Sequence, residues 1–98
     1  MSRRLIIRPE AEAELTAAFD WYEERVAGLG DDFLLHVEAV LQALLRAPRQ
    51  FPHVHRSVRR ALLRRFPYAV FYVEDEERVV VLSVFHAKRN PRQWQDRH

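Results

Sequence analysis

An imidazole and two cationic side chains stand at the end of the most apolar run of the chain. Residues 78–86 (RVVVLSVFH) end in His86, and Lys88 and Arg89 follow directly. If this run is a strand, it brings these polar groups to one end of a sheet. Histidine titrates near neutral pH and arginine pairs well with phosphate, so the two residue types together can bind and process a phosphodiester.

A second basic group lies earlier, in residues 58–65 (VRRALLRR). In a strand, Arg60 and Arg64 share one face because side chains alternate between the two faces. Where this strand passes His86, the imidazole can act as acid or base in attack by an RNA 2′-hydroxyl, while arginines stabilise the developing charge. The alternative is an edge strand whose arginines are solvated and only discourage aggregation.

Other catalytic and cofactor chemistries lack the residues that they need. There is no glycine-rich phosphate loop, no serine nucleophile elbow and no cysteine. His53 and His55 alternate as in some metal sites, but no third ligand stands at a suitable spacing, so we expect no metal and no cofactor. Glu10, Glu12 and Glu14 spread around a helix, so we expect surface charge that favours the helix N-terminus.

The composition is that of one small domain spanning residues 1–98. The absence of cysteine fits a reducing compartment. No run approaches the roughly 20 apolar residues that cross a bilayer. We therefore expect a cytoplasmic protein with no membrane partner.

Charge is divided unevenly along the chain. Residues 1–48 hold five arginines and nine acidic residues, a net charge of −4. Residues 49–98 hold ten arginines and one lysine against five acidic residues, a net charge of +6. This asymmetry predicts an anionic partner for the second half, either nucleic acid or an acidic protein segment.

Hydrophobic periodicity predicts the element order βααβββ. Two amphipathic helical segments are separated by Gly28 and Gly30, and Pro48 ends the second. So short a connection makes the helices an antiparallel hairpin, and short turns make the last three strands antiparallel. We expect an α+β fold with this hairpin on one face of an antiparallel sheet, followed by a short C-terminal segment. The expected ranges are 4–8 for the first strand, 9–27 for the first helix, a cap at Asp31 or Asp32 and then a helix to Ala47, a loop over 49–57, and strands at 58–65, 68–74 and 78–86.

The last strand has an unusual pattern. Residues 79–85 are apolar at every position except Ser83, which is typical of a strand covered on both faces. The helical hairpin can cover only one face. The other face must be covered by the C-terminal segment with Trp94, or by another chain.

Three stretches of the chain, taken together, have a familiar order and spacing. The first is a strand followed by an acidic, alanine-rich helix; the second is R-x-L-L-x-x-F-P-Y-x-V-x-Y, from Arg60 to Tyr72. The third is V-x-x-V-F-H-x-x-R-x-P-x-x-W, from Val81 to Trp94. In these features the sequence resembles the RelE/ParE superfamily of bacterial type II toxins, which includes plasmid stabilisation toxins. FPYAVFY and VFHAKRNP are most similar to the ParE-like branch.

The resemblance implies a growth inhibitor that is neutralised by a cognate antitoxin in a hetero-oligomer. In this family the C-terminal segment of the antitoxin, commonly acidic, wraps the toxin over exposed sheet and groove. Such a partner would match both the basic second half of the chain and its doubly apolar last strand.

Two toxic activities occur in the superfamily. ParE-like members poison DNA gyrase without established catalytic residues, and this is the function we favour. RelE-like members cut mRNA on the ribosome; the absence of a tyrosine after Tyr72 weakens that alternative, for which His86, Arg64 and Arg89 are the catalytic candidates. A non-toxin nucleic-acid-binding module is a further alternative. The candidate contacts to target or antitoxin are Arg60, Arg64, His86, Lys88, Arg89 and Trp94.

Overall fold

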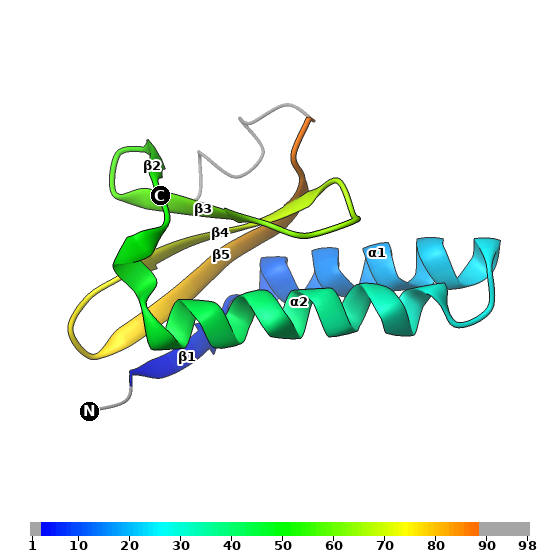
Figure 1. The fold of residues 1–98 in the computed structure, drawn as a ribbon, viewed down its shortest axis with the longest axis horizontal. Helices are drawn as coiled ribbons and strands as arrows, with labels where there is room; N and C mark the ends of the chain where they lie inside the picture. Colours follow the sequence, from blue (N-terminus) through cyan, green and yellow to red (C-terminus); the bar gives the residue numbers. More distant parts are fainter. Residues whose placement is uncertain (1–2, 89–98) are drawn as a thin grey trace.

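Two helices lie against one face of a five-stranded sheet (Figure 1). The structure, a computed structural model, describes residues 3–88. The predicted α+β class and the helical hairpin are confirmed. In chain order the elements are β1 (Arg4–Ile7), α1 (Pro9–Arg25), α2 (Leu29–Arg46), the 3-10 helix η1 (Pro48–Gln50), β2 (His53–His55), β3 (Val58–Leu62), β4 (Tyr68–Glu74) and β5 (Arg78–His86).

The sheet is mixed, whereas an antiparallel sheet was expected. Its strand order is β1-β5-β4-β3-β2, and β1 runs parallel to β5, with Arg4 opposite Arg78 and Ile7 opposite Val81. The other neighbouring strands are antiparallel. The difference has a simple cause: β1 and β5 are joined through both helices and three strands, so no tight turn between them imposes an antiparallel pair.

Two segments around β3 differ from the sequence prediction. The expected loop over residues 49–57 contains η1 and β2, and β2 pairs with β3 through a turn in which Arg56 has a φ of 53°. The strand expected over residues 58–65 ends at Leu62. Arg65 has a φ of 66°, in the left-handed region, so the chain turns before Pro67 instead of extending to it.

The helical hairpin is joined more tightly than predicted. α1 begins at Pro9 as expected, but it ends at Arg25, and α2 begins at Leu29, ahead of the predicted cap at Asp31 or Asp32. The carboxylate of Glu23 in α1 accepts hydrogen bonds from the backbone N–H groups of Gly28 and Gly30, both at 2.9 Å. Glu23 thus caps the next helix across the hairpin, where the positive end of the helix dipole favours an anion.

Gly30 is required by the close approach of the helices. A Cβ atom at this position would lie 2.8 Å from the Phe19 ring. Further along the interface, the rings of Tyr22, Phe33, Phe66 and Tyr68 pack mainly edge to face, with centroids 5.0–6.1 Å apart. This aromatic cluster joins the hairpin to the end of the sheet where β4 begins and β5 ends.

The opposite face of the sheet is also apolar, as the pattern of the last strand predicted. Val58, Ala69, Phe71, Leu82 and Phe85 form a second buried cluster on this face. Both helices lie on the other side, so no helix of residues 3–88 covers the second cluster (Figure 1). The C-terminal segment with Trp94 lies outside the described residues. The predicted second cover therefore stays a prediction.

One end of the sheet is fastened to η1 by polar contacts. Arg59 Nη1 donates to the carbonyl oxygens of Phe51, at 2.6 Å, and Arg49, at 3.2 Å. The Nε of Arg59 lies 3.8 Å from Glu74 Oε1, and the Tyr72 hydroxyl donates to the Pro48 carbonyl. Burial, partly offset by the Arg59 charge, raises the pKa of Tyr72 to about 12, so the phenol stays a donor.

The turn between β4 and β5 closes the same end. Asp75 Oδ1 accepts hydrogen bonds from the backbone N–H groups of Glu77, at 2.8 Å, and Arg78, at 2.7 Å. These bonds hold the pKa of the Asp75 carboxyl below its usual value, because they favour the charged form.

Neither helix within residues 3–88 has the length and apolar character needed to span a membrane.

Candidate functional site

A groove lies at the other end of the sheet, between α1 and the ends of β4 and β5. Its volume is about 440 Å³. One wall is the flank of α1, where two alanines lie between larger residues, and the other is formed by the Pro67–Tyr68 segment and the last residues of β5. The lining residues are Glu14, Ala17, Ala18, Trp21, Tyr22, Pro67, Tyr68, Val84, Phe85 and His86. The groove therefore combines apolar walls, several aromatic rings, one carboxylate and one imidazole.

His86 is held in a defined position on the helix-facing side of the sheet. It is paired with Tyr68 across the β4–β5 ladder, and the centroids of the two rings lie 5.5 Å apart with an interplanar angle of 65°. The backbone N–H of Lys88 donates to His86 Nδ1 at 3.2 Å. Since Nδ1 accepts this hydrogen bond, the neutral ring carries its proton on Nε2, and in this geometry His86 is a hydrogen-bond donor with no free base nitrogen.

Glu14 connects the groove wall on α1 to the edge of β5. Its Oε1 accepts hydrogen bonds from Ser83 Oγ, at 2.8 Å, and from the backbone N–H of Val84, at 3.3 Å. The sequence predicted a surface charge at this position, but Glu14 is half-buried and bonded to the sheet. The prediction was wrong for Glu14 because the flank of α1 lies along the edge of β5, a tertiary contact that helix periodicity cannot reveal.

The outer part of the groove is aromatic and accessible. Trp21 is 50% exposed although it is the largest apolar residue of α1. The guanidinium carbon of Arg25 lies 3.5 Å from the centroid of its ring, a cation–π contact. Beside it, burial and the neighbouring Tyr68 raise the pKa of Tyr22. A half-exposed tryptophan at the edge of an aromatic groove is typical of protein-binding surfaces.

The structure does not bring all of the predicted basic residues together. Arg60 is paired with Phe71, whose side chain belongs to the second apolar cluster, whereas His86 is paired with Tyr68, which packs on the helix-facing cluster, so Arg60 and His86 lie on opposite faces of the sheet. Arg64 is exposed in the turn between β3 and β4, and Lys88 is exposed just beyond β5. A hydrogen bond from the Ala87 N–H to the Pro67 carbonyl, at 2.8 Å, places this turn and the end of β5 side by side. Arg89 and Trp94 lie outside the described residues.

Arg64, His86 and Lys88 therefore meet at one end of the sheet, and Arg60 does not join them. The imidazole and the arginines expected from the strand pattern do not form one catalytic cluster within residues 3–88. No group of three or more potential metal ligands comes together in that part of the chain either. The arrangement is suited to binding a macromolecule. An apolar aromatic groove lies at the same end of the sheet as two exposed cations, Arg64 and Lys88, which we call the cationic rim.

Sequence reasoning missed the α1 side of this site. Glu14, Ala17 and Trp21 lie on the flank of the helix beside its apolar stripe, three and four residues apart along the chain. The signal in the sequence that could have indicated this side of the site was a small residue, Ala17, near Trp21 on one flank of the helix. The contact of that flank with β5 only became visible in the folded structure.

Comparisons with known proteins agree with one another. Residues 5–91 match the family described as "ParE toxin of type II toxin-antitoxin system, parDE". Proteins named "Toxin ParE2" from two strains of Mycobacterium tuberculosis are 33% identical over 92 residues, which covers 93% of this chain and 88% of each relative. A solved structure titled "Chromosomal ParDE TA system from P. aeruginosa" has the same fold, with a TM-score of 0.78 at 18% identity. That match covers 88% of this chain and 97% of the other.

Proposed function

This chain belongs to the ParE toxin family of type II toxin–antitoxin systems, and we propose that it arrests growth by binding DNA gyrase in the cytoplasm until a cognate antitoxin neutralises it. The observation that carries the proposal is the match to the ParE family over residues 5–91, almost the whole chain. The relatives named as ParE2 toxins support it, since they match over 93% of this chain. The proposed activity requires a binding surface and no chemical step.

The groove and its cationic rim are suited to that role. Arg64 and Lys88 are exposed at the end of the sheet where the groove lies, and the half-exposed Trp21 lines that groove, so charge can steer a partner while an aromatic ring anchors it. Fifteen of the sixteen cations of the chain are arginines, which form paired hydrogen bonds with carboxylates. An acidic antitoxin segment would therefore find both charge and apolar surface at the same end of the sheet.

The competing activity is cleavage of mRNA on the ribosome. That reaction needs an acid or base close to cations that stabilise the phosphorane. In the described residues, His86 Nδ1 already accepts a hydrogen bond and Arg60 lies on the opposite face of the sheet. Both features favour gyrase inhibition over ribonuclease activity.

An induction experiment separates the two activities. The protein is expressed without antitoxin, and cells are sampled early for morphology, DNA-damage response, protein synthesis and mRNA integrity. Gyrase poisoning predicts filamentous cells and an SOS response while translation continues, and the purified protein should inhibit supercoiling by gyrase. Prompt loss of translation with cut mRNA would instead establish the ribonuclease.

The control for this experiment is the antitoxin itself. We expect a short neighbouring reading frame that encodes a small protein with an acidic, helical C-terminal segment. Its co-expression should restore growth and yield a toxin–antitoxin hetero-oligomer on size-exclusion chromatography. If no neighbouring frame restores growth, the antitoxin part of the proposal fails.

A further inference from the structure

The second apolar cluster is more completely buried than an open sheet face would be. Its members are between 0% and 7% exposed: Val58, Ala69, Phe71, Leu82 and Phe85. They lie on the face opposite to the helices, and no apolar residue of either helix packs against them. Large apolar side chains on a face that meets solvent keep part of their surface exposed, so this face has a cover.

The burial is confined to a band that crosses the sheet obliquely. The band runs from Phe85 near the end of β5, over Phe71 of β4, to Val58 at the start of β3. On the same face, Leu62 at the other end of β3 is 56% exposed, and Val73 at the far end of β4 is only partly buried. A single segment of chain covers so narrow a band, whereas a folded partner would also bury its flanks.

The cover belongs to the chain itself. The exposed fractions are those of one chain alone, so neither a second copy nor a partner contributes to this burial. Residues 1–2 precede Arg3, whose Nε donates to the carbonyl of Asp75 at 2.7 Å, in the β4–β5 turn at the end of the sheet away from Phe85. Residues 89–98, in contrast, follow directly on Lys88, three positions after Phe85.

We infer that residues 89–98, which we call the strap, cross the second face from the end of β5 toward the start of β3, with Trp94 packed on Phe71 and Leu82. Pro91 and Trp94 are the only apolar residues of the strap. One indole is enough for a narrow band, because a buried tryptophan removes about 150–250 Å² from water. The inference goes beyond the proposed function and does not depend on it.

The strap is long enough for this path. Phe85 lies level with Leu62 of β3, so the path to Val58 crosses two strand spacings and runs four residues along β3, roughly 16 Å as a diagonal. Trp94 is six residues beyond the last described residue, and six extended residues reach up to about 20 Å. Trp94 can therefore reach the middle of the band, and the residues after it can reach the start of β3.

The composition of the strap suits a segment that lies on the face of a sheet. Pro91 has no N–H to donate to a strand, but a segment held by side-chain packing needs no such bond. In this role Trp94 stabilises the fold, whereas the sequence suggested a contact to target or antitoxin. The second face then needs no partner.

Paramagnetic broadening tests the strap in the full-length chain. The chain has no cysteine, so a nitroxide can be attached at Leu62→Cys, beside the band, or at Leu35→Cys, an exposed position on α2. The indole N–H signal of Trp94, assigned by comparison with Trp21→Phe, should lose most of its intensity with the Leu62→Cys label. The Leu35→Cys label, on the helix side of the protein, is the matched control and should leave the signal unchanged.

A mixing experiment distinguishes the strap from a second copy. Isotope-labelled chain without nitroxide is mixed with unlabelled chain that carries the Leu62→Cys label, and the Trp94 signal should keep its intensity. Broadening in this mixture would assign the cover to a second copy. Full intensity in the singly labelled chain itself would mean that Trp94 lies away from this face. Either result overturns the inference.

Substitution of Trp94 tests what the strap does for the fold. Trp94→Ala should expose the second cluster, so that binding of an apolar fluorescent dye increases severalfold. Gln93→Ala, at the neighbouring position, is the matched control and should bind the dye as the wild type does. Equal dye binding by wild type and Trp94→Ala would contradict the inference. If Trp94→Ala does not fold, the broadening measurement still decides, because it uses the native tryptophan.

A conservative variant separates packing from target contact. Trp94→Phe retains an aromatic ring for the band, so it should arrest growth like the wild type at equal, quantified expression. A loss of toxicity in Trp94→Phe without increased dye binding would make Trp94 a contact to the target and overturn its assignment to the strap.

Discussion

The two ends of the sheet use similar residues for opposite purposes. At the end near η1, Arg59, Tyr72 and Asp75 bond to backbone groups of neighbouring segments. At the other end, Arg64 and Trp21 remain exposed beside a groove. The side chains of Arg59 and Glu74 are only 14% and 11% exposed. Hence Arg59 in β3 stabilises the fold at one end of the sheet, whereas Arg64, five residues later in the chain, is available to a partner at the other end.

This contrast changes how the basic half of the chain is interpreted. The net charge of residues 49–98 suggested one continuous cationic surface. In the structure, Arg59 and Arg49 are paired with Glu74, and Arg78 is paired with Asp75, so part of that charge is neutralised within the fold. Among the described residues, Arg64, Arg65 and Lys88 remain exposed where the β3–β4 turn lies beside the end of β5, whereas Arg56 is exposed in the β2–β3 turn.

Replacing Arg59 should have the largest effect of the changes considered, and it acts at the fastened end. Arg59→Ala removes the charged donor to two carbonyl groups and leaves Glu74 without its buried partner. We expect a loss of about 2–4 kcal/mol in the free energy of unfolding, measured by urea denaturation. Arg64→Ala is the matched control from the same segment, and it should change stability by less than about 0.5 kcal/mol. Similar losses for both variants would remove the distinction between the two ends.

The fold was largely predictable because periodicity and turn residues determine it. Pro9, Pro48 and the glycines near the hairpin marked the helices, and residues 78–86 were correctly placed as a strand apolar on both faces. The parallel pairing of β1 was not predictable, since local sequence contains no signal for a partner so distant in the chain. The same holds for β2, a short segment that forms a strand by pairing with β3.

The candidate site was predicted only on its sheet side. The end of β5 and the turn with Arg64 follow from the strand pattern. By contrast, Arg60 and His86 were expected to approach each other, and the register places them on opposite faces. Glu14 and Trp21 were not included, because their role depends on which flank of α1 lies along β5. Local sequence patterns do not show which elements distant in the chain will contact each other, so this part of the site could not be predicted.

Removing the charge of Arg64 or Arg89 should have an intermediate effect, on toxicity and not on stability. Arg64→Gln removes positive charge from the β3–β4 turn, and Arg89→Gln removes it three positions after His86 in the sequence, whereas Glu10→Gln and Glu12→Gln remove negative charge at the exposed start of α1. The arginine variants should need about tenfold more protein to arrest growth, as expected for loss of one charged contact, while the glutamate variants should match the wild type. Growth is compared at equal, quantified expression. Equal toxicity of all four variants would exclude the cationic end from the mechanism.

The smallest effect is expected from the charge of Asp75, at the fastened end. Its pKa is lowered mainly by the hydrogen bonds that it accepts from the backbone of Glu77 and Arg78. A carboxyl with a lowered pKa stabilises the fold above its unfolded pKa, and this contribution is lost as the pH falls through the folded value. The difference in stability between wild type and Asp75→Asn should therefore be present at pH 7 and shrink below about pH 4. Thermal unfolding across this range measures it.

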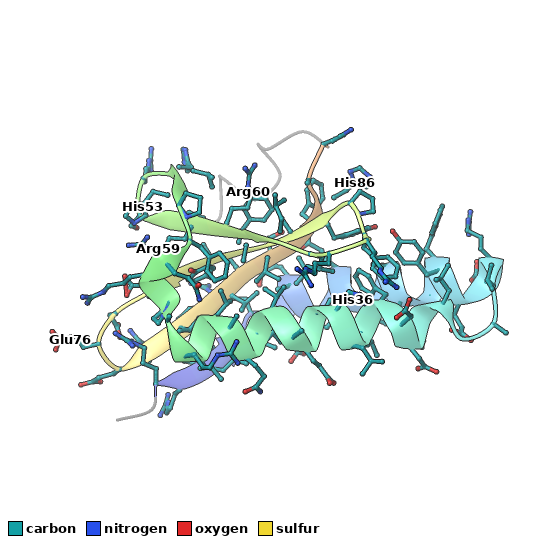
Figure 2. All side chains as sticks on the ribbon, in the orientation of Figure 1. His36, His53, Arg59, Arg60, Glu76 and His86 are labelled. Atoms are coloured by element: carbon teal, nitrogen blue, oxygen red, sulfur yellow. The ribbon has the colours of Figure 1, made fainter. Side chains whose placement is uncertain are left out.

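The control for Asp75 is Glu76, in the same turn (Figure 2). Glu76→Gln removes the same charge from a side chain that makes no hydrogen bond or ion pair within the described part of the chain, so its stability difference should vary little with pH. If both variants follow the same pH dependence, the effect comes from net charge and not from the turn. A pH-dependent difference confined to Asp75→Asn would show that this end of the sheet is fastened by specific hydrogen bonds, in contrast to the open groove at the other end.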